Sequence, residues 1–97
     1  MMYTLSFVKR AQSEYEEAVA WYEEHSEVAA DGFIAAVDVA LSLIRTYPTR
    51  WRRVFKDYYE ITLRKYPYNI IYYIDDSDTS VVVHSIFHHR RNPKKKF

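Results

Sequence analysis

The sequence predicts an α+β fold, in which an N-terminal strand and an antiparallel helical hairpin pack on a mainly antiparallel sheet of three to four strands. Three observations predict this β-α-α-β-β-β order. The hydrophobic period changes from two residues to the helical period near residue 9 and returns to two after Pro48. The link between the two helical stretches is short, so the helices must run antiparallel. Beyond Pro48, Tyr, Ile and Val dominate, and these residues favour strands.

Two helices are predicted between the first strand and Pro48. The first covers about residues 9 to 25, because its apolar side chains fall on one helical stripe: Ala11, Tyr15, Ala18, Val19 and Tyr22. Ser26 has the hydroxyl that caps a helix N-terminus and begins the second helix. Pro48 ends that helix near Tyr47, since proline cannot continue it. The second helix contributes a wide apolar face: Phe33, Val37, Ala40, Leu41 and Ile44.

The strands are predicted from alternation and from turn residues. Residues 2–8 form a short first strand, and residues 49–57 form a loop that includes a short edge strand. Residues 58–66 alternate between apolar and polar side chains, and residues 68–75 are rich in Ile and Tyr. Residues 80–89 are apolar or aromatic at nearly every position, so this last strand should lie inside the sheet.

Length and composition narrow the class of protein. Ninety-seven residues are enough for one domain, which we assign to 1–97, with 92–97 as a flexible basic tail. The absence of cysteine excludes disulfides, thiolate metal sites and a cysteine nucleophile. No apolar run approaches the roughly 18 residues of a membrane span, and the N-terminus lacks a signal-peptide pattern. We therefore expect a soluble cytoplasmic protein without a cofactor.

Charge is distributed unevenly along the chain. Residues 11–44 carry eight acidic side chains and no Lys or Arg, whereas residues 45–97 carry twelve basic and five acidic ones. Such a polarised domain usually presents its basic side to an anionic partner. The acidic stretch is also explained if it is simply the solvated side of the two helices, and both explanations can hold together.

Four segments resemble the RelE/ParE toxins of type II toxin–antitoxin systems. They are "AVAWYEEHS" at 18–26, "FIAAV" at 33–37, "LRKYPYNIIYYI" at 63–74 and "IFHHRRNP" at 86–93. The resemblance spans nearly the whole chain in the right order and spacing, and it implies the same β-α-α-β-β-β fold. Members of the RelE type cut mRNA on the ribosome, whereas members of the ParE type poison DNA gyrase by binding.

The RelE type of cleavage needs a proton acceptor, cations beside the phosphorane and a donor for the leaving oxygen. The resemblance maps the RelE lysine pair onto Glu60 and Thr62 and the following arginine onto Asn69. The last-strand arginine falls on His89, and Phe97 offers no hydroxyl in place of the C-terminal tyrosine. These losses put the chain closer to the ParE side, as a toxin for plasmid stabilisation that inhibits gyrase.

Two alternatives remain open. Some relatives use a C-terminal histidine with a glutamate and an arginine as an acid–base set, and Glu60, Arg64 and His89 would match it if their strands place them on one face. The chain would then be a ribosome-dependent mRNA endonuclease. The same histidines can instead close a strand and hydrogen-bond the backbone. The second alternative is a solitary family member without toxicity.

The resemblance implies a cognate antitoxin, whose acidic C-terminal segment folds on contact, and a heterotetramer or larger complex with it. We expect its carboxylates to meet a basic surface near the end of the chain. The residues predicted to bind a partner are Trp51, Arg64, Lys65, His88, His89, Arg90, Arg91 and Asn92.

The remaining histidines and tryptophans are the other candidates for a metal or contact site. His84 and His88 lie four residues apart on a strand, about 13 Å, and adjacent His88 and His89 point to opposite faces, so we predict no metal site. Trp51, flanked by arginines, is a candidate for contact with nucleic acid or a protein partner. Trp21 borders the stripe of the first helix, and we expect it to pack.

Overall fold

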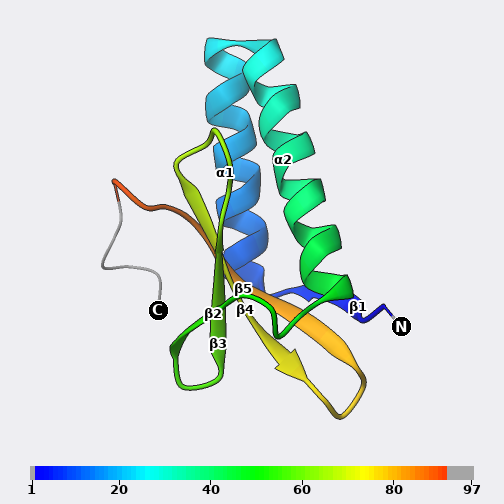
Figure 1. Ribbon diagram of the computed structural model, residues 1–97. Coiled ribbons are helices and arrows are strands. Elements are labelled where there is room, and N and C mark those ends of the chain that lie inside the picture. Colours follow the sequence, from blue (N-terminus) through cyan, green and yellow to red (C-terminus); the bar gives the residue numbers. More distant parts are fainter. Residues whose placement is uncertain (1, 92–97) are drawn as a thin grey trace.

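The computed structural model describes residues 2–91, and its elements follow the predicted order (Figure 1). Within this range the fold class is confirmed: two helices and one mainly antiparallel sheet. The elements are β1 (Thr4–Phe7), α1 (Lys9–His25), α2 (Glu27–Thr46), β2 (Arg52–Phe55), β3 (Tyr58–Thr62), β4 (Tyr68–Asp75) and β5 (Ser80–His88).

The helix boundaries come from the residues that predicted them. The Ser26 N–H donates to the Tyr22 carbonyl at 2.7 Å, which closes α1. The Ser26 hydroxyl accepts from the N–H of Ala29 at 3.2 Å, so the same residue caps α2. The second helix ends at Thr46, just before Pro48. One residue therefore separates the two helices and makes the hairpin tight.

The strands are arranged in the order β1-β5-β4-β3-β2. β1 pairs in parallel with β5, and the other pairs are antiparallel. β5 thus has a neighbour on each side, as its apolar sequence predicted. The sheet has five strands within residues 2–91, beyond the three to four expected, because the segment before β3 forms a complete edge strand.

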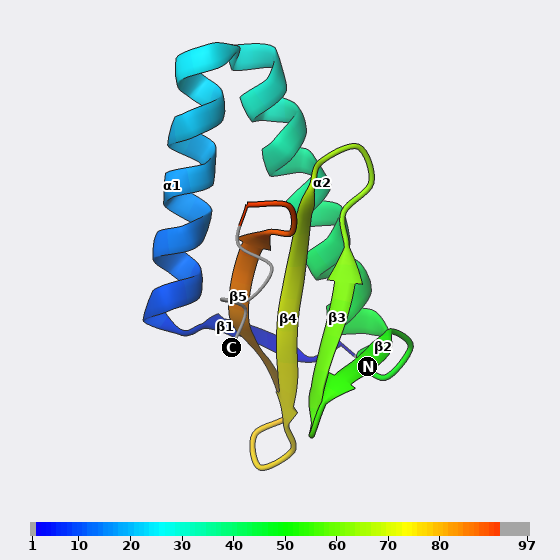
Figure 2. The same ribbon diagram turned by 90° about the vertical axis from the view of Figure 1, so that its left-hand side faces the viewer.

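The helices and the sheet share one core. Figure 2 shows α2 behind the sheet and α1 at the side of it, next to β5. The fully buried side chains at the centre are Phe33, Val37, Ile44, Ile70, Tyr72, Val81, Val83 and Ile86. Each apolar side chain of this size contributes about 1.5–3 kcal/mol when it is buried. The buried Tyr72 hydroxyl donates to the Pro48 carbonyl at 2.6 Å, which ties the end of the hairpin to the sheet.

A close contact fixes the connection between β3 and β4 against the hairpin. Gly32 of α2 faces the hydroxyl of Tyr66, and a Cβ at this position would collide with it. The same hydroxyl donates to the Ala29 carbonyl at 2.9 Å. The loop that carries Arg64 and Lys65 is therefore held beside α2 by one tyrosine.

Neither helix has the length and apolar composition that a membrane crossing requires, within the part of the chain that is described.

Candidate functional site

A polar network lies on the sheet face that points away from the core. Ile61, Ile70 and Tyr72 point into the core, so their strand neighbours Glu60 and Asn69 point to the opposite face. The Asn69 amide donates from Nδ2 to Oε2 of Glu60 at 2.9 Å. The oxygen of the Asn69 amide contacts the imidazole of His89, with 2.8 Å between Oδ1 of Asn69 and Nδ1 of His89.

The chemistry of the network decides where the His89 proton lies. A carboxylate only accepts hydrogen bonds, so the amide must turn its NH₂ group toward Glu60. The Asn69 oxygen then faces Nδ1 of His89 and accepts a hydrogen bond from its N–H group. Nε2 of a neutral His89 consequently carries the lone pair. Orientation of an imidazole by a neighbour is the arrangement that prepares a histidine to accept a proton or a hydrogen bond.

The negative charge of Glu60 is compensated by an arginine of the edge strand, β2. Arg52 stands directly opposite Glu60 in the pairing of β2 with β3, and its Nη2 lies 2.6 Å from Oε1. The Glu60 side chain is 2% exposed, whereas that of Arg52 is 73% exposed. The carboxylate therefore accepts from Arg52 on one oxygen and from Asn69 on the other, and it is shielded from solvent. Sequence alternation places Glu60 on the face away from the core, and the structure shows that it is buried there.

The three residues of the predicted acid–base set do not come together as a set. Glu60 and His89 are joined, but through Asn69. Arg64 lies in the exposed connection between β3 and β4, and the guanidinium that pairs with Glu60 is that of Arg52. Sequence reasoning missed Arg52 and Asn69 as members of the site. The available signal was the strand register, because Asn69 stands opposite Thr62, beside Glu60.

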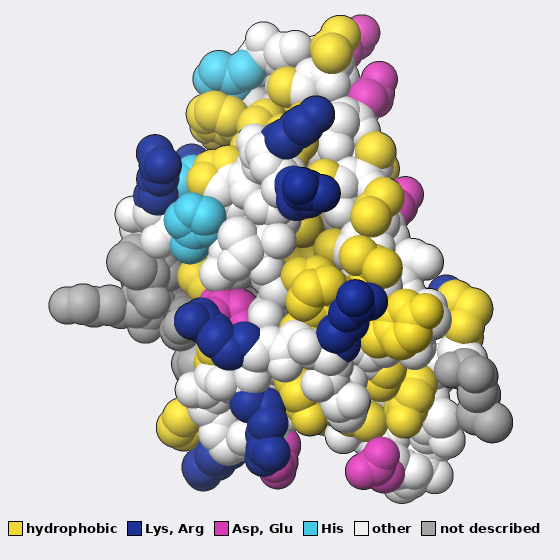
Figure 3. Space-filling view, in the orientation of Figure 1, with side chains coloured by type: hydrophobic (Ala, Val, Ile, Leu, Met, Phe, Trp, Pro, Cys, Tyr) yellow, Lys and Arg dark blue, Asp and Glu magenta, His cyan; other side chains and the backbone are white. Residues whose placement is uncertain are grey.

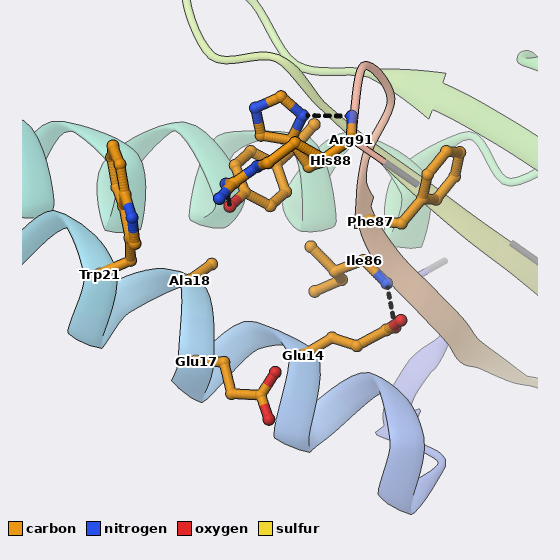
Figure 4. Close-up of a pocket in the computed structure, with 9 residues that line it drawn as sticks. Glu14, Glu17, Ala18, Trp21, Ile86, Phe87, His88 and Arg91 are labelled. Atoms are coloured by element: carbon orange, nitrogen blue, oxygen red, sulfur yellow. Dashed lines mark hydrogen bonds between the residues drawn. The ribbon is translucent and has the colours of Figure 1, made fainter. Parts of the chain in front are cut away.

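A cleft of about 300 Å³ separates α1 from β5 (Figure 4). Its floor is apolar, and its rim carries charges of both signs. The residues that line it are Glu14, Glu17, Ala18, Trp21, Tyr68, Ile86, Phe87, His88 and Arg91. A concave surface with aromatic walls and a few charged groups at its edge is the usual form of a binding site.

One side of the cleft is built by Glu14. β1 covers the edge of β5 only along residues 80–83, so the backbone N–H of Ile86 needs another acceptor. Glu14 supplies it: Oε1 accepts from the Ile86 N–H at 3.0 Å (Figure 4). The same oxygen accepts from the Ser85 hydroxyl at 2.9 Å. Arg10 pairs with the other carboxylate oxygen at 3.3 Å. This glutamate therefore links α1 to β5 by two hydrogen bonds.

The other side is formed by the turn after β5. The backbone N–H groups of Arg90 and Arg91 donate to Nδ1 of His88 at 3.2 and 3.1 Å. The Arg91 guanidinium lies 5.3 Å from the centre of the Trp21 ring and donates to the Tyr68 hydroxyl at 3.1 Å. His88 thus closes the strand and bonds the backbone, which is one of the roles left open by the sequence.

Trp21 is not packed inside, contrary to expectation. It is 41% exposed and forms part of the cleft rim. Arg91 lies over its ring, and His25 stacks on it with 4.0 Å between ring centres. An exposed tryptophan beside a cleft is typical of protein–protein contact surfaces.

Four of the predicted partner-binding residues gather in one area. The His89 N–H donates to the Pro67 carbonyl at 3.0 Å, so the turn after β5 lies beside the β3–β4 connection. We call the resulting area the basic surface, formed by Arg64, Lys65, Arg90 and Arg91. Figure 3 shows Lys and Arg side chains distributed down one face, with most acidic side chains toward its margins.

Trp51, another residue predicted to bind a partner, is not part of this surface. Trp51 is half-buried and packs against the core, with the Arg50 guanidinium 5.7 Å from its ring. Asn92 belongs to 92–97, the segment predicted to be a basic tail, which lies outside the described residues. Among residues 2–91, no three His, Asp or Glu side chains are grouped closely enough to hold a metal ion.

Solved structures with a similar fold are toxins and toxin–antitoxin complexes. The chromosomal ParDE system from P. aeruginosa aligns with a TM-score of 0.75 at 10% identity, over 90% of this chain and 96% of that chain. A mutant of E. coli RelE in the free state aligns with a TM-score of 0.68 at 22% identity, over 96% and 90%. The intact E. coli RelBE complex aligns with a TM-score of 0.63 at 23% identity, over 87% and 93%. The fold is therefore that of the RelE/ParE toxins.

A sequence model described as the ParE toxin of the type II toxin–antitoxin system, parDE, matches residues 5–93. The chain belongs to this family, on the ParE side of the RelE/ParE superfamily, as its motifs predicted. No curated protein matches it in sequence. It is a ParE-type toxin of a toxin–antitoxin system.

Proposed function

We propose that this toxin acts in the cytoplasm by binding DNA gyrase and blocking it, without cleavage chemistry of its own, and that a cognate antitoxin neutralises it. The observation that carries the proposal is the state of Glu60. It stands where RelE-type toxins carry a lysine, and it is buried and bonded to Arg52 and Asn69. A carboxylate that is already paired with Arg52 supplies no positive charge there, where cleavage needs cations.

The rest of the same face supports this reading. Thr62 and Asn69 are uncharged at the other positions where the RelE pattern has cations. The guanidinium in the network, that of Arg52, is paired with Glu60. Charge on the phosphorane would therefore be poorly compensated, while a folded protein target needs only a complementary surface.

The antitoxin is proposed to occupy the cleft between α1 and β5 and to reach the basic surface beside it. Apolar side chains of its C-terminal segment would enter between Trp21, Ile86 and Phe87, and its carboxylates would meet Arg90 and Arg91. Exposed ion pairs contribute only about 0–1 kcal/mol each, so most affinity must come from the apolar contacts. A heterotetramer or larger complex is proposed for the bound state.

The experiment follows macromolecular synthesis after induction of the toxin in cells. An early stop in thymidine incorporation, with inhibition of supercoiling by purified gyrase, is expected. Co-expression of the antitoxin should restore growth. Gyrase that keeps its full supercoiling activity in excess toxin would contradict the proposal. Normal growth on induction would instead support a solitary member without toxicity.

One observation favours a second candidate, a ribosome-dependent mRNA endonuclease. Asn69 orients His89 so that Nε2 can take a proton, and Glu60 completes the relay with Arg52 in place of the predicted Arg64. An early stop in methionine incorporation, together with cut mRNA, would establish this candidate. Cutting should then be lost in His89→Ala and retained in His88→Asn.

A further inference from the structure

The turn that closes the cleft depends on an uncharged histidine. Nδ1 of His88 accepts hydrogen bonds from the backbone N–H groups of Arg90 and Arg91, and the bond from Arg91 is drawn in Figure 4. A ring nitrogen accepts a hydrogen bond only when it carries no proton. The proton of neutral His88 must therefore sit on Nε2. A protonated His88 has N–H groups on both nitrogens and cannot hold the turn.

This turn also holds the Arg91 guanidinium on the cleft rim. With the backbone of 89–91 fixed, the Arg91 guanidinium reaches both the Trp21 ring, at 5.3 Å, and the Tyr68 hydroxyl, at 3.1 Å. Both partners line the cleft. If the two backbone bonds to His88 break, Arg91 loses the fixed backbone from which it spans the rim.

The surroundings of His88 oppose protonation while the turn is closed. Burial lowers the pKa of His88 from its usual 6.5, and the nearby charge of Arg91 lowers it further. Tyr68 packs edge-on against the imidazole, with ring centres 5.1 Å apart. The charged and titratable groups that face His88 from its own turn, from β4 and from α1 are His89, Arg90, Arg91, Tyr68, Glu14 and Glu17.

The direction of the pH effect follows from that lowered pKa. An opened turn exposes His88 to water and returns its pKa toward 6.5, so the open form binds the proton more readily than the closed form. The closed turn is therefore fully favoured above pH 6.5, and the preference is lost as the pH falls through the lower pKa of the closed form. Glu14 and Glu17 line the same cleft from α1, and with them in place the net direction for His88 is still a lowered pKa.

We propose that residues 88–91 form a proton-controlled latch, in which neutral His88 holds Arg91 across the rim of the α1–β5 cleft and protonated His88 releases it. Acid would then uncover the Trp21 ring and move a cation away from the cleft. As a regulator of antitoxin binding the latch rests on the proposed function, whereas the opening itself does not.

The test uses the full chain with Trp21 as the reporter. The protein has two tryptophans, so Trp51→Phe leaves Trp21 as the single emitter. His25 stacks on Trp21, so His25→Gln is combined with it to remove this second imidazole from the reporter ring. Emission and the amide exchange of Arg90 and Arg91 are followed from roughly pH 8 to pH 5. Emission should shift to longer wavelength and exchange should quicken together, with a midpoint below 6.5.

Two variants of His88 separate the latch from general acid effects. His88→Asn keeps an acceptor oxygen where Nδ1 lies but cannot titrate, so the turn should stay closed with no transition. His88→Leu has no acceptor and should show the acid spectrum already at neutral pH. A parent protein without a transition, or an equal transition in His88→Asn, would overturn the proposal. No partner is needed, so the result stands whatever the toxin's target.

Discussion

The side chain of Asn69 joins Glu60 to His89 across strand β4. Glu60 lies on β3 and His89 follows β5, so β4 separates them. A neutral amide can connect a carboxylate and an imidazole because it donates on one side and accepts on the other. An arginine at this position could not accept from His89. Asparagine therefore fits this network. Compared with the RelE pattern, which has an arginine here, this face carries one cation fewer.

Asn69→Leu should lower the free energy of unfolding by about 1–3 kcal/mol, because Glu60 would stay buried without its second donor. Urea denaturation measures the change. The matched control is Thr62→Val at the exposed position directly opposite, which should stay within about 0.5 kcal/mol. Equal losses for the two variants would show that the network does not stabilise the sheet.

Arg52→Met should cost about 1–2 kcal/mol, since it removes the cation from a buried carboxylate. The control is Arg53→Met on the same strand, which breaks an exposed pair with Asp57 and should cost about 0–1 kcal/mol. Adding Glu60→Gln to Arg52→Met should recover stability, because the buried charge is then gone. If the double variant is the least stable of the set, the buried charge is not the cause.

Glu14→Ala should be destabilising by about 1–3 kcal/mol, because the Ile86 N–H and the Ser85 hydroxyl would lose their acceptor. Amide exchange at Ile86 should become faster in the same variant. Glu17→Ala, one turn away and exposed, is the control and should leave both the melting temperature and this exchange unchanged. Unchanged exchange at Ile86 in Glu14→Ala would contradict the assignment.

Because of Tyr72, we expect the free energy of unfolding to fall in alkali. Burial raises the pKa of Tyr72 far above its usual 10.0, so the folded state resists ionisation that the unfolded chain accepts. Its contribution is complete below pH 10 and is lost progressively above that value. Tyr72→Phe should cost about 0.5–1.5 kcal/mol at neutral pH and flatten this alkaline decline. Tyr73→Phe, on the other face of β4, should preserve it.

The helical hairpin and the order of the helices and strands along the chain could be predicted, because local chemistry determines them. Ser26 both ends α1 and caps α2, and Pro48 stops α2. The alternation of apolar residues marks the strands that were expected. The strand at Arg52–Phe55 was harder to recognise because it is short and polar, with an irregular register against β3.

The side-chain network was not predictable from alternation. Alternation assigns Glu60 to the face away from the core. It does not show that Glu60 is buried on that face as well. That depends on Arg52 and Asn69, which lie on two other strands whose register is set by the whole sheet. The exposure of Trp21 was not predictable either, because its place beside the helical stripe does not show that the ring lies on the rim of the α1–β5 cleft.

The central claim is that this toxin inhibits by association and not by cutting RNA. The most direct test adds purified protein to a cell-free translation reaction and maps the 5′ ends of the mRNA by primer extension. The account predicts an intact message at every toxin concentration, in the same preparation that inhibits gyrase. Cuts that appear in the ribosomal A site, and that vanish when His89 is changed to alanine or Glu60 to glutamine, would contradict it.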